Sequence, residues 1–161
     1  MRLIVILIFT LIVIPDLWSQ TSVEGWEFLK WKMKKAEVEK EIAEQTGIDR
    51  GSMLDARFDY NGMSAWLEYN ENDELVKVTQ RETFAVIYDE EAEKFYNERM
   101  VYMTGKYGEP KEKIHDRKND NIHVTWEFPH TLITLEYDYK YKVIDELGAG
   151  SYWVDILYEY R

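Results

Sequence analysis

The sequence contains no cysteine. A disulfide framework, which stabilises many small exported domains, is therefore excluded, and the hydrophobic core must hold the fold alone. The same absence excludes a lipid-acceptor cysteine near the N-terminus and a cysteine nucleophile. Hydrophobic residues make up 45% of the chain and charged residues 32%, as in an ordinary folded domain. A domain of this size buries roughly 68–70% of its unfolded surface, which is enough for stability without cross-links.

Basic residues are also scarce. The chain has 20 Lys and Arg against 31 Asp and Glu, which gives a formal net charge of -11 at pH 7. Binding to nucleic acid or to anionic lipid headgroups needs clustered Lys and Arg that displace counterions. We therefore expect no nucleic-acid partner and no membrane contact except through the N-terminal segment.

The apolar run near the N-terminus is too short for an ordinary membrane-spanning helix, which needs roughly 20 apolar residues. The run extends from Leu3 to Ile14 without a charge, Arg2 precedes it, and Pro15 ends it. Polar residues follow, with Ser19 as a small residue suited to a cleavage site. This pattern is typical of a secretion signal.

We therefore predict a signal peptide over residues 1–19 and a single mature domain over residues 20–161. The protein would then be exported to the periplasm or the extracellular space. An uncleaved N-terminal membrane anchor is the alternative, because Leu17 and Trp18 lengthen the apolar stretch and a thin membrane needs fewer apolar residues.

Two segments have the pattern of helices. In Lys34–Gly47, Val38 and Ile42 share one stripe, and Gly47 is placed to end the helix in a left-handed conformation. The second helix should begin at Asp89, an N-capping residue type followed by carboxylates that favour the helix dipole. Its inward face should consist of Ala92, Phe95, Tyr96, Arg99, Met100, Met103 and Tyr107.

Six segments alternate between apolar and polar residues, the pattern of half-buried strands. Asn61-Gly62 between the first two predicts a tight hairpin turn. Lys111–Asn121 is predicted to be a charged loop. The predicted strands are Leu54–Tyr60, Met63–Tyr69, Leu75–Phe84, Ile122–Phe128, Ile133–Tyr141 and Tyr152–Tyr160.

The resulting order is helix, three strands, helix, three strands. Because no strand pair within a half is joined by a helix, antiparallel meanders are expected, with the helices on one face. The predicted fold class is α+β. The pattern leaves open whether the halves form one six-stranded sheet or two packed units.

Two short segments resemble known families. Trp31-Lys32-Met33 is followed by Glu37-Val38, and Lys106–Pro110 is followed by an alternating strand through Trp126. This arrangement is similar to small exported bacterial domains made of helix-then-meander units, namely the outer-membrane assembly lipoproteins of the SmpA type and the β-lactamase-inhibitor proteins. The resemblance implies their architecture and a non-catalytic, protein-binding role.

The chain departs from those families at two positions. Lys32 and Lys34 stand where the families tend to have a glycine and an N-capping Ser or Thr. The matching residues are packing and turn residues, so a function carried over from them is an analogy.

The histidines do not have the spacing of a metal site. His115, His123 and His130 form no pair at helical or short spacing, and His123 and Glu127 on one strand face stand roughly 13 Å apart. The acidic stretch Asn70–Glu74 has oxygen ligands for calcium but lacks the spacing and glycine of an EF-hand loop. We expect neither a metal nor a cofactor.

No nucleophile is placed for acyl transfer. Ser52, Ser64 and Ser151 lie outside any Gly-x-Ser-x-Gly elbow. With 31 acidic residues, carboxylate pairs are inevitable and therefore uninformative. The prediction is a non-enzymatic protein with no catalytic residues, and a carboxylate-dependent hydrolase is an alternative.

Aromatic residues are abundant, with 12 Tyr, 6 Trp and 6 Phe. Their rings could fill the core between sheet and helices, or some could form a surface for a protein, a cell-envelope component or sugar rings. The leading hypothesis is a domain that binds a protein or envelope component through the exposed face of its sheet. A carbohydrate-binding module is the alternative. The residues predicted to contact the partner are Trp66, Tyr137, Tyr139, Tyr141, Trp153 and Tyr158.

Overall fold

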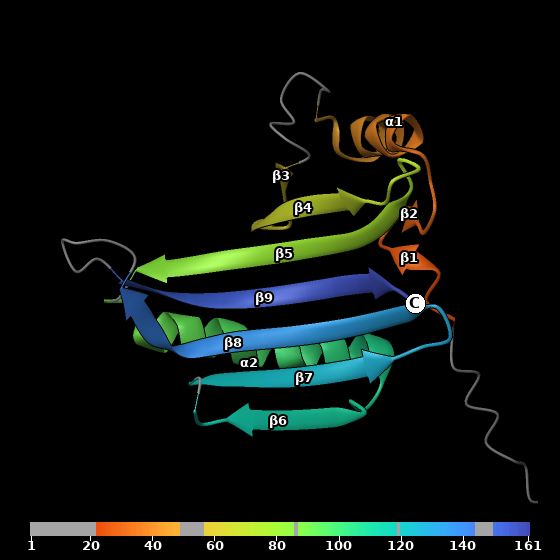
Figure 1. Ribbon diagram of the computed structural model, residues 1–161. Helices are drawn as coiled ribbons and strands as arrows, with labels where there is room; N and C mark the ends of the chain where they lie inside the picture. Colours follow the sequence, from red (N-terminus) through yellow and green to blue (C-terminus); the bar gives the residue numbers. More distant parts are fainter. Residues whose placement is uncertain (1–21, 49–56, 86, 119, 144–149) are drawn as a thin grey trace, which may run out of the picture.

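The computed structural model describes residues 22–48, 57–85, 87–118, 120–143 and 150–161, and of residues 139–143 it describes the backbone alone (Figure 1). The predicted signal peptide and its cleavage site lie outside these residues. The described part contains 2 helices, a 2-stranded hairpin and a 7-stranded antiparallel sheet. The predicted α+β class is therefore confirmed. None of the described helices has the length and apolar character needed to cross a membrane.

The larger sheet, called the main sheet below, has the strand order β3-β4-β5-β9-β8-β7-β6, and every neighbouring pair is antiparallel. The last strand, β9, lies between β5 and β8, so strands from both halves of the chain form one sheet. The strands are β3 Arg57–Tyr60, β4 Met63–Tyr69, β5 Leu75–Ala85, β6 Glu112–Asp116, β7 Asn121–Glu127, β8 Thr131–Val143 and β9 Gly150–Tyr160.

Two parts of the strand prediction were wrong. Glu112–Asp116 forms the edge strand β6, where a charged loop was predicted, and it pairs only with β7. Four of its five residues are exposed, so its sequence lacks the apolar alternation that marks a half-buried strand. A short hairpin, β1 (Gly25–Trp26) and β2 (Leu29–Lys30), also precedes the first helix.

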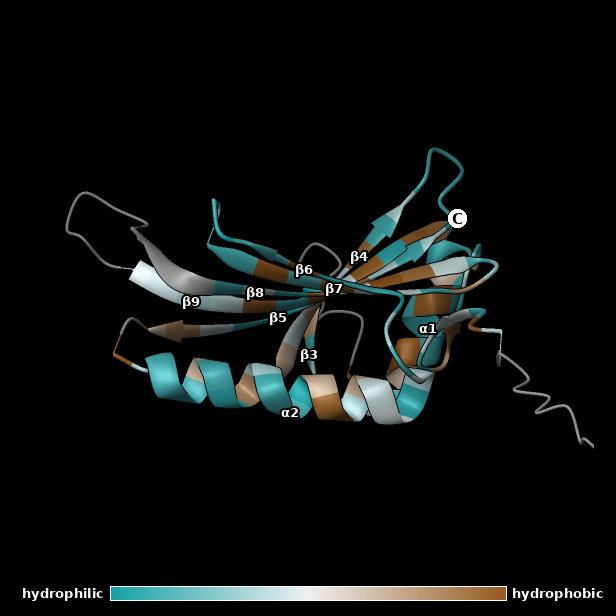
Figure 2. Ribbon diagram, turned by 90° about the horizontal axis from the view of Figure 1, so that it is seen from below, coloured by the Kyte–Doolittle hydropathy of each residue, from teal (hydrophilic) through white to brown (hydrophobic). Residues whose placement is uncertain are grey.

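Helix α2 (Asp89–Tyr107) runs along one side of the main sheet (Figure 2). Its buried residues are Ala92, Tyr96 and Met103, as its periodicity predicted. The predicted N-cap was wrong by one residue. Tyr88 occupies the cap without a side-chain bond, and Asp89 in the first turn accepts the backbone N–H of Glu90 at 2.9 Å.

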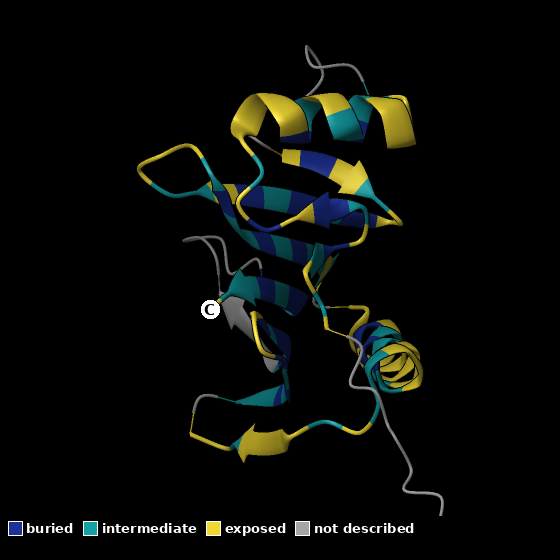
Figure 3. Cartoon of the chain, turned by 90° about the vertical axis from the view of Figure 1, so that its right-hand side faces the viewer, coloured by how far each residue is buried: buried dark blue, intermediate teal, exposed yellow. Residues whose placement is uncertain are grey.

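Helix α1 (Lys35–Thr46) lies beside the β3–β4 end of the sheet, as Figures 1 and 3 both show. The predicted placement of both helices on one face of the sheet is therefore not confirmed, although the buried residues of both belong to one core. Val38 and Ile42 are buried, and Gly47 ends the helix at φ 71°, as expected. An ion pair of 3.0 Å between Lys34 and Glu74 fastens the start of α1 to the β4–β5 turn.

Burial alternates along the strands (Figure 3). The side of the sheet that faces α2 carries the hydrophobic core, and the β1–β2 hairpin closes one end of it with Trp26 and Leu29, both buried. Trp26 packs edge-on against the rings of Phe58, Tyr60 and Tyr158. The largest fully buried side chains are Trp26, Trp126, Tyr158, Leu29, Ile42, Met63, Leu75, Met103, Ile133, Leu135, Val38 and Val78.

Candidate binding face

The side of the main sheet opposite α2, called the open face below, carries no helix among the described residues (Figure 2). Strand pairing aligns its side chains in rows that run across the sheet. One row, called the central row, crosses all 7 strands of the sheet. From β3 to β6 its members are Asp59, Ser64, Arg81, Asp155, Glu136, His123 and Ile114.

A two-pronged ion pair lies at the centre of this row. Arg81 donates from Nε and Nη2 to the two carboxylate oxygens of Asp155, at 2.6 and 2.5 Å. Asp155 is only 8% exposed although it is on the uncovered side. Its hydrogen bonds raise the pKa of Arg81 against the opposing effect of burial, and the charges of Asp138 and Glu136 add to the rise. The guanidinium is therefore held in one orientation by the surrounding acids.

The flanks of the central row are also hydrogen-bonded. His123 Nδ1 and Glu136 Oε1 lie 3.0 Å apart. At the other end, Arg57 Nη2 donates to the Ser64 hydroxyl at 3.0 Å, and that hydroxyl donates to Asp59 at 3.1 Å. The polar groups of the row are thus held in three hydrogen-bonded sets, Arg57–Ser64–Asp59, Arg81–Asp155 and His123–Glu136.

Two of the predicted partner-binding residues, Trp66 and Trp153, lie on the open face and are partly exposed. An arginine stacks on each of them. The guanidinium of Arg57 lies 4.9 Å from the Trp66 ring centre, and that of Arg81 lies 5.1 Å from the Trp153 ring centre. The structure therefore brings these two tryptophans to the same surface and attaches each to the central row.

Two other predicted residues, Tyr137 and Tyr158, lie on the opposite side of the sheet, beneath α2. Tyr137 stacks on Tyr96 of that helix at 5.0 Å, and the Tyr158 hydroxyl lies 3.8 Å from the Met103 sulfur. They are 5% and 2% exposed, and burial raises the pKa of Tyr137 to about 12. The prediction that they contact a partner is therefore corrected: these rings belong to the core.

The last two predicted residues, Tyr139 and Tyr141, belong to strand β8, but their side chains lie outside the described part. Sequence reasoning missed the arginines of the open face and the central pair of Arg81 with Asp155. The alternation of β9 did indicate that Asp155 points away from the core, but the sequence contained no signal for its partner in β5.

Acids outnumber bases on the open face. Among the residues whose side chains the structure describes, the strands place three basic residues there, Arg57, Lys77 and Arg81. Lys111 and Arg161 also pair with Glu127 of this face. The acids on the same side are Asp59, Glu68, Glu112, Asp116, Glu127, Glu136, Asp138, Asp155 and Glu159.

A cleft of about 1400 Å³ lies between the β1–β2 hairpin, the end of α2 and β7. Its walls include the rings of Phe28, Tyr107 and Phe128. Four of its charged groups pair within the protein, because Lys106 pairs with Glu27 at 2.9 Å and Lys111 pairs with Glu127, which also pairs with Arg161. This cleft is a weaker candidate than the open face, where an ordered polar network surrounds two tryptophans.

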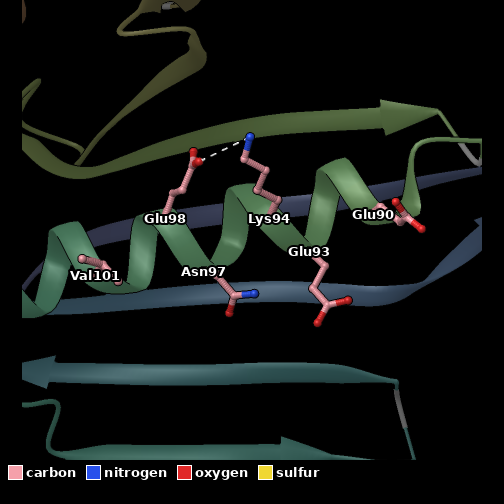
Figure 4. A pocket seen from close by; sticks show the side chains of 6 residues that line it. All are labelled: Glu90, Glu93, Lys94, Asn97, Glu98 and Val101. Carbon is pink, nitrogen blue, oxygen red and sulfur yellow. Dashed lines mark ion pairs between the residues drawn. The ribbon is translucent and has the colours of Figure 1, made fainter.

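A shallow hollow of about 590 Å³ lies on the outer side of α2 (Figure 4). Its described lining comes from this helix alone, and Lys94 and Glu98 pair there at 3.9 Å. The helix provides no opposing wall that would enclose a ligand.

No group of three or more His, Asp or Glu side chains in the described ranges is placed to hold a metal ion. Glu82, whose pKa burial raises, lies on the α2 side, away from the central row. Comparisons of the chain with protein-family models, with curated proteins and with solved structures give no match.

Proposed function

We propose that this protein is a non-enzymatic binding domain that recognises another protein through its open face. The observation that carries the proposal is the ordered central row with a tryptophan on either side of it. Tryptophan and arginine are the residues most enriched at energetic hot spots of protein interfaces. The open face presents both types next to each other, on strands that keep the side chains in place.

Arginine stacking favours a protein partner over a sugar. Carbohydrate recognition would use an accessible ring face, and on both Trp66 and Trp153 a guanidinium occupies one face of the ring. A protein partner can instead contact the ring edge, the guanidinium and the neighbouring acids together.

Affinity capture from the cell envelope of the source organism tests this proposal. The purified protein serves as bait beside a double variant, Trp66→Ala with Trp153→Ala. We expect a specific partner to be retained by the unaltered protein and lost by the double variant, because truncating two hot-spot residues weakens binding by roughly 2–4 kcal/mol or more.

A matched control is the double variant Tyr88→Ala with Tyr102→Ala. These aromatic residues are 47% and 48% exposed but belong to α2 and its N-cap. The control should capture the same partner as the unaltered protein. Equal capture by all three proteins would contradict binding through the open face. A glycan ligand that only the tryptophan variant fails to bind would show carbohydrate binding instead of protein binding.

We further propose that the protein works outside the cytoplasm after removal of residues 1–19. The apolar run and the polar residues that follow it support this location. Sequencing the N-terminus of the protein isolated from its host tests the proposal. A start near residue 20 in an exported fraction is expected, and a cytosolic protein that retains Arg2 would contradict it.

A further inference from the structure

Strand β6 forms an edge of the main sheet, and no second described strand pairs with it. It pairs with β7 alone, whereas the opposite edge of the sheet lies beside α1 (Figure 1). An edge strand presents a row of backbone N–H and C=O groups that can pair with another chain. Four of the five β6 residues are exposed, and α2 packs mainly against β5, β8 and β9.

The side chains of β6 combine charge with one exposed apolar residue. Strand pairing places Glu112, Ile114 and Asp116 on the open face, and Lys113 lies on the other side. Ile114 is 47% exposed and is the β6 member of the central row. The edge strand thus has an apolar residue between two acids on the open face and a basic residue on the other side.

The same side chains oppose pairing between two copies of the chain. In an antiparallel pair centred on Ile114, Glu112 of one copy faces Asp116 of the other. A shift by two residues toward the N-terminus places Lys113 opposite itself. These two registers set like charges directly opposite each other, which is destabilising. A shift toward the C-terminus places Lys113 opposite Arg117 and Glu112 opposite Lys118, so repulsion and attraction balance and the charges do not favour the pair.

We propose that β6 binds an extended segment of a different protein as an added antiparallel strand. The segment carries basic residues opposite Glu112 and Asp116, an apolar residue opposite Ile114 and an acid opposite Lys113. Backbone hydrogen bonds supply the affinity of such strand addition, and the alternating side chains supply its specificity. The added strand extends the open face. The inference shares with the proposed function only the premise that the ligand is a protein.

A synthetic peptide with the core Lys-Thr-Ile-Glu-Lys, blocked at both ends, matches this pattern and serves as the probe. Titration into the isotope-labelled full chain should shift the NMR signals of β6 and neighbouring β7 residues and slow hydrogen exchange of alternate β6 amides. We expect a Kd on the order of 0.1–1 mM, since ordering a short peptide offsets much of its interaction energy. A peptide with the same residues in scrambled order should bind at least roughly threefold more weakly, because its charges meet the wrong partners.

Two backbone-methylated peptides separate strand addition from simple charge attraction. Each has the matched sequence, and the two are N-methylated on alternate sets of peptide nitrogens. Only one set points toward β6 in an added strand, so one peptide should lose binding and the other should retain it. If both methylated peptides bind equally, or if the NMR signals of β6 do not shift, β6 is only an edge strand whose charges prevent pairing. The inference would then be wrong.

Two protein variants complete the test. Glu112→Lys should weaken the matched peptide by roughly threefold and strengthen a peptide in which the facing Lys is replaced by Glu. The Trp66→Ala, Trp153→Ala double variant should bind the matched peptide normally, because neither residue contacts β6 in the pairing. Loss of peptide binding in that variant would show that the peptide binds the open face and would contradict binding at β6. If the peptide does not bind β6 but the open face still captures its partner, the proposed function stands and only this inference is wrong.

Discussion

The two faces of the main sheet are made from the same strands but are held together by different interactions. Along β9, Val154, Ile156 and Tyr158 point to α2 and are at most 2% exposed. The alternate residues Trp153 and Asp155 point to the open face, where they stack on or pair with Arg81. One face is stabilised by removal of apolar surface from water, and the other by a hydrogen-bonded polar network at the surface.

This difference suggests a division of roles. Substitutions beneath α2 should lower stability and affect binding only through the folded fraction. Substitutions on the open face should have smaller effects on stability and larger ones on recognition.

The largest expected difference is between two leucines of strand β8. Leu135 is fully buried beneath α2, and Leu132 is partly exposed on the open face. Leu135→Ala should lower the free energy of unfolding by about 2–5 kcal/mol, because it leaves a cavity in a packed core. Leu132→Ala should lower it by less than about 1.5 kcal/mol, because less apolar surface is buried there. Urea unfolding of both variants measures the difference, and equal losses would refute the division between the faces.

The second difference is between two ion pairs of the open face. Asp155 and Arg81 have side chains that are 11% and 38% exposed, whereas Lys77 and Glu68, 3.2 Å apart, are 26% and 56% exposed. In double-mutant cycles the first pair should show a coupling energy of about 1–3 kcal/mol. This is below the 3–5 kcal/mol loss on breaking a fully buried pair, because solvent reaches Arg81. The Lys77–Glu68 pair should show less than about 1 kcal/mol, as exposed pairs do.

Asp155→Asn and Arg81→Met supply the first cycle, and Glu68→Gln and Lys77→Met supply the second. Each asparagine or glutamine retains the shape of the acid that it replaces. A coupling energy for Lys77–Glu68 as large as that for Arg81–Asp155 would show that the central row is no more ordered than the rest of the open face.

Much of the fold followed from local patterns in the sequence. Gly47 ends α1 with φ 71°, and Asn61-Gly62 forms the β3–β4 turn with φ 52° and 76°, as predicted. The inward side of α2 was also predicted correctly. These features depend on residues that are close in sequence, so their signals are contained in short segments.

The features that were missed depend on long-range pairing. Strand β6 has little apolar surface to reveal it in the sequence. Arg81 and Asp155 are 74 positions apart in the sequence, and their contact follows only from the adjacency of β5 and β9. Local periodicity cannot specify strand order.

Strand parity distinguishes buried tyrosines from residues of the open face. Tyr137 has the same strand parity as Ile133 and Leu135, and the structure places all three in the core. Trp153 and Tyr158 have opposite parity in one strand, so they cannot share a face. Parity alone therefore assigned Tyr137 and Tyr158 to the core once Ile133 and Ile156 were assigned to it.

The smallest predicted effect concerns Glu82, an acid on the α2 side of the sheet. It lies in β5 opposite Val154, and burial raises its pKa above the ordinary value of 4.5, although the charge of Arg99 partly opposes this. A carboxyl with a raised pKa in the folded state binds a proton more readily there than in the unfolded chain. The contribution of Glu82 to stability should therefore decrease as the pH rises from about 4.5 through the raised pKa, and then level off.

Glu82→Gln removes this titration and should stabilise the protein at pH 7 by less than about 1 kcal/mol, since solvent still screens part of the charge. Urea unfolding between pH 4.5 and 7 measures the effect, and the difference between variant and unaltered protein should grow with pH. Glu112→Gln, an exposed change on β6, is the matched control and should show no such growth. If Glu82→Gln destabilises the protein at pH 7, Arg99 stabilises the charged Glu82 carboxylate by more than burial destabilises it. The α2 side of the sheet would then tolerate an acid as readily as the open face does.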